Sequence, residues 1–133
     1  MKLLTDCIPK NKFDEAAIQR LRNIEPDEWT PIIHDLIEWL QDMCWPVAHP
    51  LAEQLRRYHG KKLTDEIKTI LKTQDFIWQF NVLNQLVLYD PILVQTLQSE
   101  LSQLANNATA DEKLDDLDRI AQEIMLGRVD VLN

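Results

Sequence analysis

The stretch that decides the fold is LIEWLQDMCWPVA at residues 36–48, which holds two of the four tryptophans in the chain. Its first half continues a series of apolar residues spaced three and four positions apart, as on one face of a helix. Pro46 interrupts this series. Because the residue before a proline avoids the α region and the proline ring fits the first turn of a helix, we expect one helix to end and another to begin here. The stretch therefore predicts a helix-to-helix corner.

Apolar residues at helical spacing recur on both sides of this corner. Together with prolines and capping residues they predict seven helices, at residues 14–24, 31–43, 46–60, 64–73, 75–89, 91–106 and 109–127. The predicted N-caps include Asp14, Asp75, Asp90 and Thr109, the last of which opens a capping box with Glu112. Residues 82–89 are rich in β-forming side chains, but a lone strand would have no partner in the chain. Short links between helices predict an all-α fold of antiparallel helical hairpins in a single domain, residues 1–133.

The composition excludes several classes of protein. A chain of 133 residues with 45% hydrophobic and 27% charged residues can bury an ordinary core without metals or disulfides. The net charge of −8 opposes general binding to nucleic acid, which needs lysine and arginine against phosphate, and makes a basic protein partner easier to accommodate. No apolar run approaches the roughly 20 residues that span a bilayer, and residues 1–10 lack the core of a signal peptide. We therefore expect an acidic, cytoplasmic protein that does not bind a membrane.

The two cysteines, Cys7 and Cys44, cannot define a disulfide framework and match no metal-binding spacing. A nucleophile built on Cys44 has no assignable base or orienting acid, and a thiol between helices is more often a small buried apolar group. The pattern favours a reducing compartment and a structural role for Cys44.

A short pattern in the deciding stretch occurs a second time. Asp-x-x-Trp stands at Asp42 and Trp45 and again at Asp75 and Trp78, each time between two predicted helices. A short acidic side chain at such a corner can cap the second helix while the tryptophan fills the space beside it. The repetition favours a structural role for Trp45 and Trp78, in which each packs at the corner between two helices.

Four pieces of the sequence together resemble a known family. They are IPKNKFDE at residues 8–15, EWLQDMCWPVA at 38–48, LKT with IW at 71–73 and 77–78, and LANN at 104–107. In this order, and over nearly the whole chain, they resemble the small bacterial proteins of domain of unknown function 5071. The resemblance implies an all-α, HEAT-like right-handed array of about seven helices. It implies no activity, substrate or catalytic residue.

Tryptophans and the acidic residues beside them form the candidate interaction surface, because tryptophan is enriched at binding hot spots. Trp29 lies in a polar link and is expected to be the most exposed tryptophan, or else a hydrophobic staple for the next helix. Packing in the core and at corners is the favoured interpretation for the other three. The full candidate set is Trp29, Trp39, Asp42, Trp45, Asp75 and Trp78.

Histidines and carboxylates at helical spacing raise the alternative of a metal centre. His34 and Glu38 stand four residues apart, but the sequence fixes no third ligand among Asp35, Asp42, His49 and His59. Solvated helix faces are therefore favoured, and we expect no metal and no cofactor.

Three functional hypotheses remain open. The first is a non-catalytic protein-interaction module with an unidentified protein partner, for which a basic protein is a candidate. Its most concrete form is an immunity-type protein that neutralises a toxin. The alternative is a small-molecule or metal-dependent enzyme that uses a groove near Trp45 and Trp78. The third is a protein that acts mainly as a homodimer, so that both monomer and homodimer are allowed. The absence of a recognisable catalytic pattern favours the interaction module over the enzyme.

Overall fold

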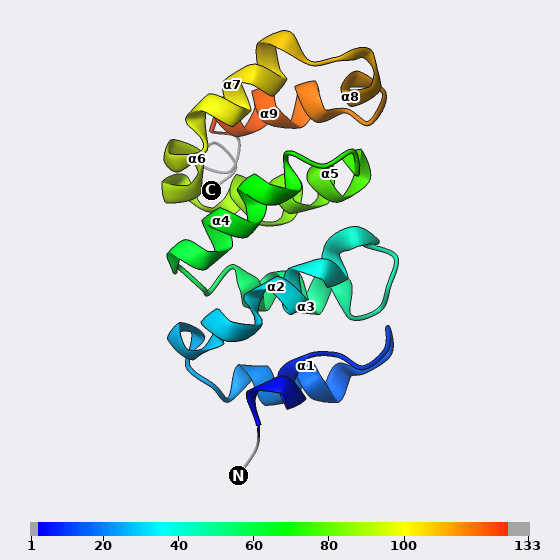
Figure 1. Ribbon diagram of the computed structural model, residues 1–133, viewed down its shortest axis with the longest axis vertical. Helices are drawn as coiled ribbons and strands as arrows, with labels where there is room; N and C mark the ends of the chain where they lie inside the picture. The colour runs from blue at the N-terminus through cyan, green and yellow to red at the C-terminus, as the bar shows by residue number, and fades with distance from the viewer. Residues whose placement is uncertain (1–2, 128–133) are drawn as a thin grey trace. The chain divides into compact units, whose positions relative to one another are not determined.

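The computed structural model describes residues 3–127, and every helix and turn discussed below lies in that range. The regular elements in these residues are α-helices and 3-10 helices, and no strand occurs among them (Figure 1). The predicted all-α fold is confirmed. None of these helices is long and apolar enough to cross a bilayer. The described chain separates into two compact units, Met1–Glu66 and Ile67–Asn133, which are described in turn. The single domain and the HEAT-like arrangement stay predictions.

The first unit contains short helical segments joined by tight turns. Its elements are η1 (Leu4–Cys7), α1 (Glu15–Arg22), η2 (Pro26–Ile32), α2 (Ile33–Ile37), η3 (Glu38–Gln41), α3 (Ala48–Leu55) and the first part of α4 (Lys61–Ile70). Asp14 caps α1 as predicted, because its Oδ1 accepts a hydrogen bond from Ala17 N–H at 3.3 Å. The core of this unit forms where α1 and α2 pack against α3.

The predicted helix 31–43 is broken into three pieces, η2, α2 and η3. Pro31 lies inside η2, where a proline cannot donate a hydrogen bond, and this segment takes the tighter 3-10 form. The next helix, α3, begins at Ala48 rather than at Pro46. Pro50 is then the third residue of α3, and the N–H that it lacks belongs to the first turn, where no intrahelical acceptor exists. Pro50 therefore fits without a kink.

The second unit contains α5 (Phe76–Gln85), η4 (Val87–Tyr89), α6 (Pro91–Thr96), α7 (Gln98–Asn107), α8 (Ala110–Leu114) and α9 (Leu117–Met125). The helices α7 and α9 lie side by side, and α9 also packs on α5 (Figure 1). Three predicted caps are confirmed. Asp75 and Asp90 accept backbone N–H bonds at the starts of α5 and α6, and Thr109 forms its capping box with Glu112.

Three long helices predicted in this unit are each divided. The predicted helix 75–89 becomes α5 and η4. The predicted helix 91–106 becomes α6 and α7, which meet at Leu97. The predicted helix 109–127 becomes α8 and α9, because Asp116 adopts a left-handed conformation with φ of 61°. Aspartate tolerates this region better than most residues, and it is therefore a suitable break point. The described residues thus contain nine α-helices and four 3-10 segments where seven helices are predicted, and η1 has no predicted counterpart.

Candidate functional site

A shallow groove on the first unit brings together two tryptophans and two carboxylates. Its volume is about 280 Å³, and it is lined by Ile8, Pro9, Asp35, Glu38, Trp39, Gln41 and Trp45. Segments far apart in the sequence contribute to it: residues 8 and 9 follow η1, whereas residues 35–45 come from α2, η3 and the turn after η3. The groove therefore exists only in the folded chain.

The tryptophans Trp39 and Trp45 pack against each other at the groove. Their ring centroids lie 5.3 Å apart, and the ring planes are inclined by 70°, an edge-to-face arrangement. Both residues are half-buried. Each ring therefore packs against the other and still has part of its surface exposed to solvent.

Asp42 shapes the turn that carries Trp45. Its Oδ1 accepts a hydrogen bond from Cys44 N–H at 2.8 Å, and its carbonyl oxygen accepts one from Trp45 N–H at 3.2 Å. A side-chain bond to the backbone two residues on is characteristic of an Asx turn. Asp42 does not line the groove, so its part in the candidate surface is to position the turn.

The second copy of the pattern has related but different geometry. Asp75 accepts a hydrogen bond from Trp78 N–H at 3.0 Å and is a true N-cap, because α5 begins at the next residue. After Asp42, by contrast, a turn of several residues precedes α3. Trp78 is half-buried and lies in the second unit. The groove lining includes neither Asp75 nor Trp78.

The expectation that Trp29 is the most exposed tryptophan is wrong. Its side chain is completely buried, its indole Nε1–H donates to the carbonyl of Ile24 at 3.1 Å, and the Arg57 guanidinium lies 5.6 Å from the ring centroid. The polar link that carries Trp29 folds into η2, which turns the indole into the core. Trp29 is therefore a structural residue and does not belong to an interaction surface.

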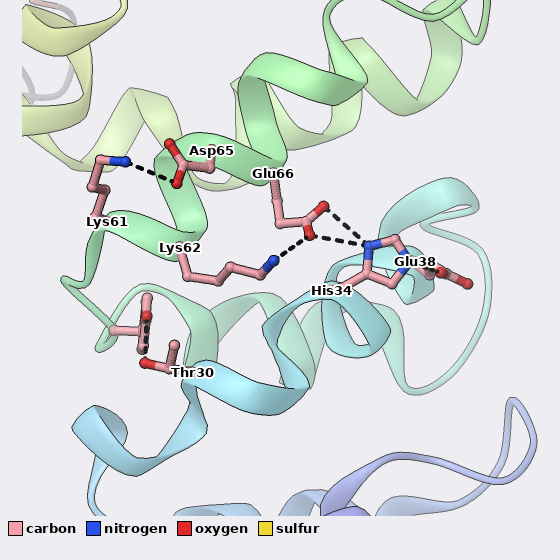
Figure 2. A network of polar contacts seen from close by, with 8 residues as sticks. Thr30, His34, Glu38, Lys61, Lys62, Asp65 and Glu66 are labelled. Atoms are coloured by element: carbon pink, nitrogen blue, oxygen red, sulfur yellow. Dashed lines mark hydrogen bonds and ion pairs between the residues drawn. The ribbon is translucent and has the colours of Figure 1, made fainter.

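A polar network lies beside the groove and is centred on His34 (Figure 2). The imidazole Nε2 lies 2.8 Å from Glu38 Oε1, and Nδ1 lies 3.1 Å from both carboxylate oxygens of Glu66. Lys62 Nζ also contacts Glu66, at 3.2 Å. The side chain of His34 is 56% exposed, whereas that of Glu66 is only 11% exposed. Glu66 is thus a nearly buried acid that holds an exposed histidine.

The network shifts the pKa values of His34 and Glu66. The hydrogen bond with Glu66 is the largest effect and raises the pKa of His34 above its ordinary value. Burial, the next largest effect, lowers this pKa, and the negative charges of Glu66, Glu38 and Asp35 raise it. Burial alone would raise the pKa of Glu66, but hydrogen bonds from His34 and Lys62 outweigh it and hold that pKa below its ordinary value. Both shifts favour the charged forms of the pair.

Replacing Glu66 with glutamine is expected to lower the pKa of His34, because the main contact that stabilises the imidazolium loses its charge. An NMR titration of the imidazole protons measures this, with Glu53→Gln as an exposed control on α3. The raised pKa means that the contact stabilises the fold below pH 6.5 and that this contribution is lost as the pH rises through the pKa of folded His34. The difference in the free energy of unfolding between the parent and Glu66→Gln should therefore decrease as the pH rises through the pKa of folded His34. An unchanged pKa of His34 would contradict the assignment.

The role of Glu66 was not predicted from the sequence, although a signal for it exists. On α4 the apolar residues Leu63, Ile67 and Ile70 form the buried stripe, and Glu66 stands three residues after the first and four before the last. A charged residue within an apolar stripe must find a partner when the stripe is buried. The pattern marks Glu66 but does not say that the partner is His34.

The predicted metal constellation is only partly brought together. Ligand atoms of His34, Asp35 and Glu38 all lie within 4.8 Å of one another, and His49, His59 and Asp42 are not part of this group among the described residues. Cys44 is exposed, so the expectation that it is a buried apolar group is wrong. It sits in the turn after Asp42, where its N–H bond to that residue keeps the backbone at the surface.

Two further hollows lie on the second unit and are mostly apolar. One is lined by Leu88, Tyr89, Pro91, Val94, Ile124, Met125 and Gly127, and the other by Ile77, Phe80, Leu114, Asp115 and Asp116. Neither contains Trp78.

Comparison with known proteins identifies the family. A search of the curated proteins finds no match. The family model described as Domain of unknown function (DUF5071) matches residues 7–125, which is most of the chain and includes every residue of the groove. The chain therefore belongs to the DUF5071 family, a domain of unknown function.

Proposed function

We propose that this chain is a non-catalytic protein-binding module and that the groove around Trp39 and Trp45 takes a basic segment of a partner protein. The proposal rests on one observation: aromatic and acidic side chains line the same groove. Two half-exposed indoles and the carboxylates of Asp35 and Glu38 line the same surface. Aromatic faces attract the cations of arginine and lysine, and carboxylates hold a guanidinium through paired hydrogen bonds. An arginine side chain satisfies both at once.

The size of the groove favours side chains over an enclosed substrate. Pockets that bury a drug-sized ligand measure roughly 300–1,000 Å³ and surround most of the ligand surface. The groove here measures about 280 Å³ and is shallow. It can accommodate a few side chains of an extended or helical segment.

The charge of the whole chain supports a basic partner. The net charge of −8 attracts positively charged proteins at long range and speeds their encounter, an effect that weakens as salt is added. A concrete form of the proposal is an immunity-type protein whose partner is a basic toxin. The more general form, a module for a basic protein segment, does not depend on that identification.

Binding of an arginine-rich peptide tests the groove, and the four tryptophans supply their own controls. In a nitrogen-15 NMR spectrum each indole N–H gives a separate signal. We expect the signals of Trp39 and Trp45 to move as the peptide is added. The signal of buried Trp29 and that of Trp78, which is outside the groove lining, should stay in place. Equal movement of all four signals, or of none, would contradict the proposal.

Substitution makes the same test quantitative. Trp39→Ala should weaken peptide affinity by about tenfold or more, because a tryptophan at a hot spot contributes at least 1.4 kcal/mol. The matched control is Ile92→Ala, which removes an apolar side chain that is 70% exposed on the second unit.

Asp35→Asn should reduce both the affinity and its dependence on salt, and Asp27→Asn, an exposed acid outside the groove lining, should change neither by as much. Titration calorimetry at several salt concentrations measures the peptide affinity and its dependence on salt. Equal peptide affinity in Trp39→Ala and the parent would refute the site.

A further inference from the structure

The carboxylates around His34 form an arrangement that ordinary surface pairing does not require. Three acids converge on one imidazole: Glu38 at Nε2, Glu66 at Nδ1, and Asp35, whose carboxylate oxygen lies within 4.8 Å of ligand atoms of both His34 and Glu38. Figure 2 shows His34 between Glu38 on one side and Glu66 on the other. The two ring nitrogens thus face two different acids, one exposed and one nearly buried.

We propose that His34, Asp35 and Glu38 bind a divalent transition-metal cation, with Zn²⁺ as the best fit, and that Glu66 is the positioning residue that orients the His34 ring. This inference goes beyond the proposed binding of a basic segment. Because both use the carboxylates of Asp35 and Glu38, a bound cation and a bound guanidinium would compete for them. The ligand set of one imidazole nitrogen and two carboxylate oxygens is one that Zn²⁺ accepts, usually with water at the remaining position. An all-oxygen site would instead suit Mg²⁺ or Ca²⁺.

The distances are compatible with this ligand set after a small adjustment. Zinc binds histidine nitrogen and carboxylate oxygen at about 2.0–2.2 Å, so two ligand atoms of one ion lie at most about 4.4 Å apart. The three ligand atoms here span up to 4.8 Å, and His34 Nε2 and Glu38 Oε1 are only 2.8 Å apart. Because all three side chains reach solvent, rotation of a carboxylate can close the difference without moving the backbone.

The contact between His34 and Glu66 prepares the ring for a metal. A histidine that binds a metal usually donates its other ring N–H to a carboxylate, which fixes the tautomer and the ring orientation. Glu66 lies 3.1 Å from Nδ1 through both of its oxygens and is itself held by Lys62. In the charged ring Nε2–H faces Glu38. A cation that displaces this proton to solvent would take the Nε2 lone pair, while the proton on Nδ1 stays with Glu66.

The charges of the cluster also suit a divalent ion. Lys62 pairs with Glu66, which leaves the two carboxylates of Asp35 and Glu38 on the exposed side of the imidazole. A cation of charge +2 would neutralise these two acids, and such an ion is the dominant local charge once it is bound. The arrangement therefore combines suitable ligands, an oriented ring and a matching charge.

Calorimetric titration of the chelator-treated chain of 133 residues with Zn²⁺ alone tests the site. We expect one Zn²⁺ per chain at this cluster, and much weaker binding of Mg²⁺. His34→Gln should weaken Zn²⁺ binding by about tenfold or more, which corresponds to 1.4 kcal/mol or more. His49→Gln, an exposed histidine outside the cluster, is the matched control and should bind as the parent does. Absence of Zn²⁺ binding, or equal binding by His34→Gln and the parent, would overturn the proposal.

The positioning role of Glu66 needs a separate readout. Glu66→Gln should weaken Zn²⁺ binding by about 10–100-fold, the usual loss when the partner of a metal-binding histidine is removed. It should also change the visible absorption bands of Co²⁺ bound in place of Zn²⁺, which report ligand geometry. Far-UV circular dichroism confirms that the variant is folded. Unchanged Zn²⁺ affinity and an unchanged Co²⁺ spectrum would refute the positioning role.

Peptide binding measured with chelator present tests the proposed function separately. The Zn²⁺ site and the binding of a basic segment can therefore each fail without the other.

Discussion

Trp29→Ala is expected to lower the free energy of unfolding by about 3–5 kcal/mol, the range typical of large aromatic side chains removed from a core. The indole is completely buried, so truncation leaves a cavity that the short elements around it can close only in part. It also removes the hydrogen bond from Nε1 to the carbonyl of Ile24 and the stacking of Arg57 on the ring. A loss of this size is a large fraction of the stability of an ordinary domain.

Denaturant unfolding followed by far-UV circular dichroism measures this loss without relying on the tryptophan that is removed. Trp39→Ala is the internal comparison, because its half-buried indole should cost clearly less. If Trp29→Ala does not fold, Trp29→Phe keeps most of the apolar volume and should cost roughly 1–3 kcal/mol, mainly through the unpaired carbonyl of Ile24. An unfolding midpoint equal to that of the parent in Trp29→Ala would show that the indole does not support this core.

Local features of the fold were predictable because their causes lie within a few residues. The caps at Asp14, Asp75, Asp90 and Thr109 were all predicted, and each bonds to a backbone N–H two or three positions on. Breaks within helices were harder to predict. The left-handed residue Asp116 divides one predicted helix, yet aspartate also occurs freely at helix starts and on exposed faces. Its sequence position alone does not separate these cases.

The candidate site was predictable only in part, because its geometry is not local. Trp39 and Trp45 were singled out, but the groove also needs Ile8 and Pro9 from a distant segment. The contact between His34 and Glu66 joins residues 32 positions apart. Periodicity shows which residues share the face of one helix and says nothing about which faces meet.

The burial of Trp29 has the same kind of cause. A polar link next to a proline is typical of an exposed loop, and this composition predicts an exposed Trp29. In the structure, 3-10 bonds tighten residues 26–32 and turn one side of the link inward. The tightening depends on packing against the rest of the first unit, which the composition of the link does not reveal.

Gly60→Ala is the second large effect expected, a loss of about 1–3 kcal/mol from overpacking. The backbone of Gly60 does not require glycine through a positive φ, which in the described residues occurs at Asp116 and Gly127. The requirement is space. A Cβ at position 60 would lie 2.5 Å from Tyr58 Cζ and still closer to its hydroxyl, and the Tyr58 ring is almost completely buried. Alanine also restricts the unfolded chain more than glycine does, and this stabilises the fold by only about 0.4–1 kcal/mol.

The contact that must yield in Gly60→Ala can be identified by a double-mutant cycle. The Tyr58 hydroxyl lies 2.8 Å from Thr30 Oγ1, and a Cβ at position 60 pushes directly against that hydroxyl. Thr30→Val alone removes the hydrogen bond and should cost about 1 kcal/mol. In the Gly60→Ala background the bond is already broken, so the same substitution should cost much less, which appears as coupling between the two sites. Strictly additive losses would show that the Tyr58 hydroxyl stays in place and that the strain of Gly60→Ala is relieved by the backbone before α4.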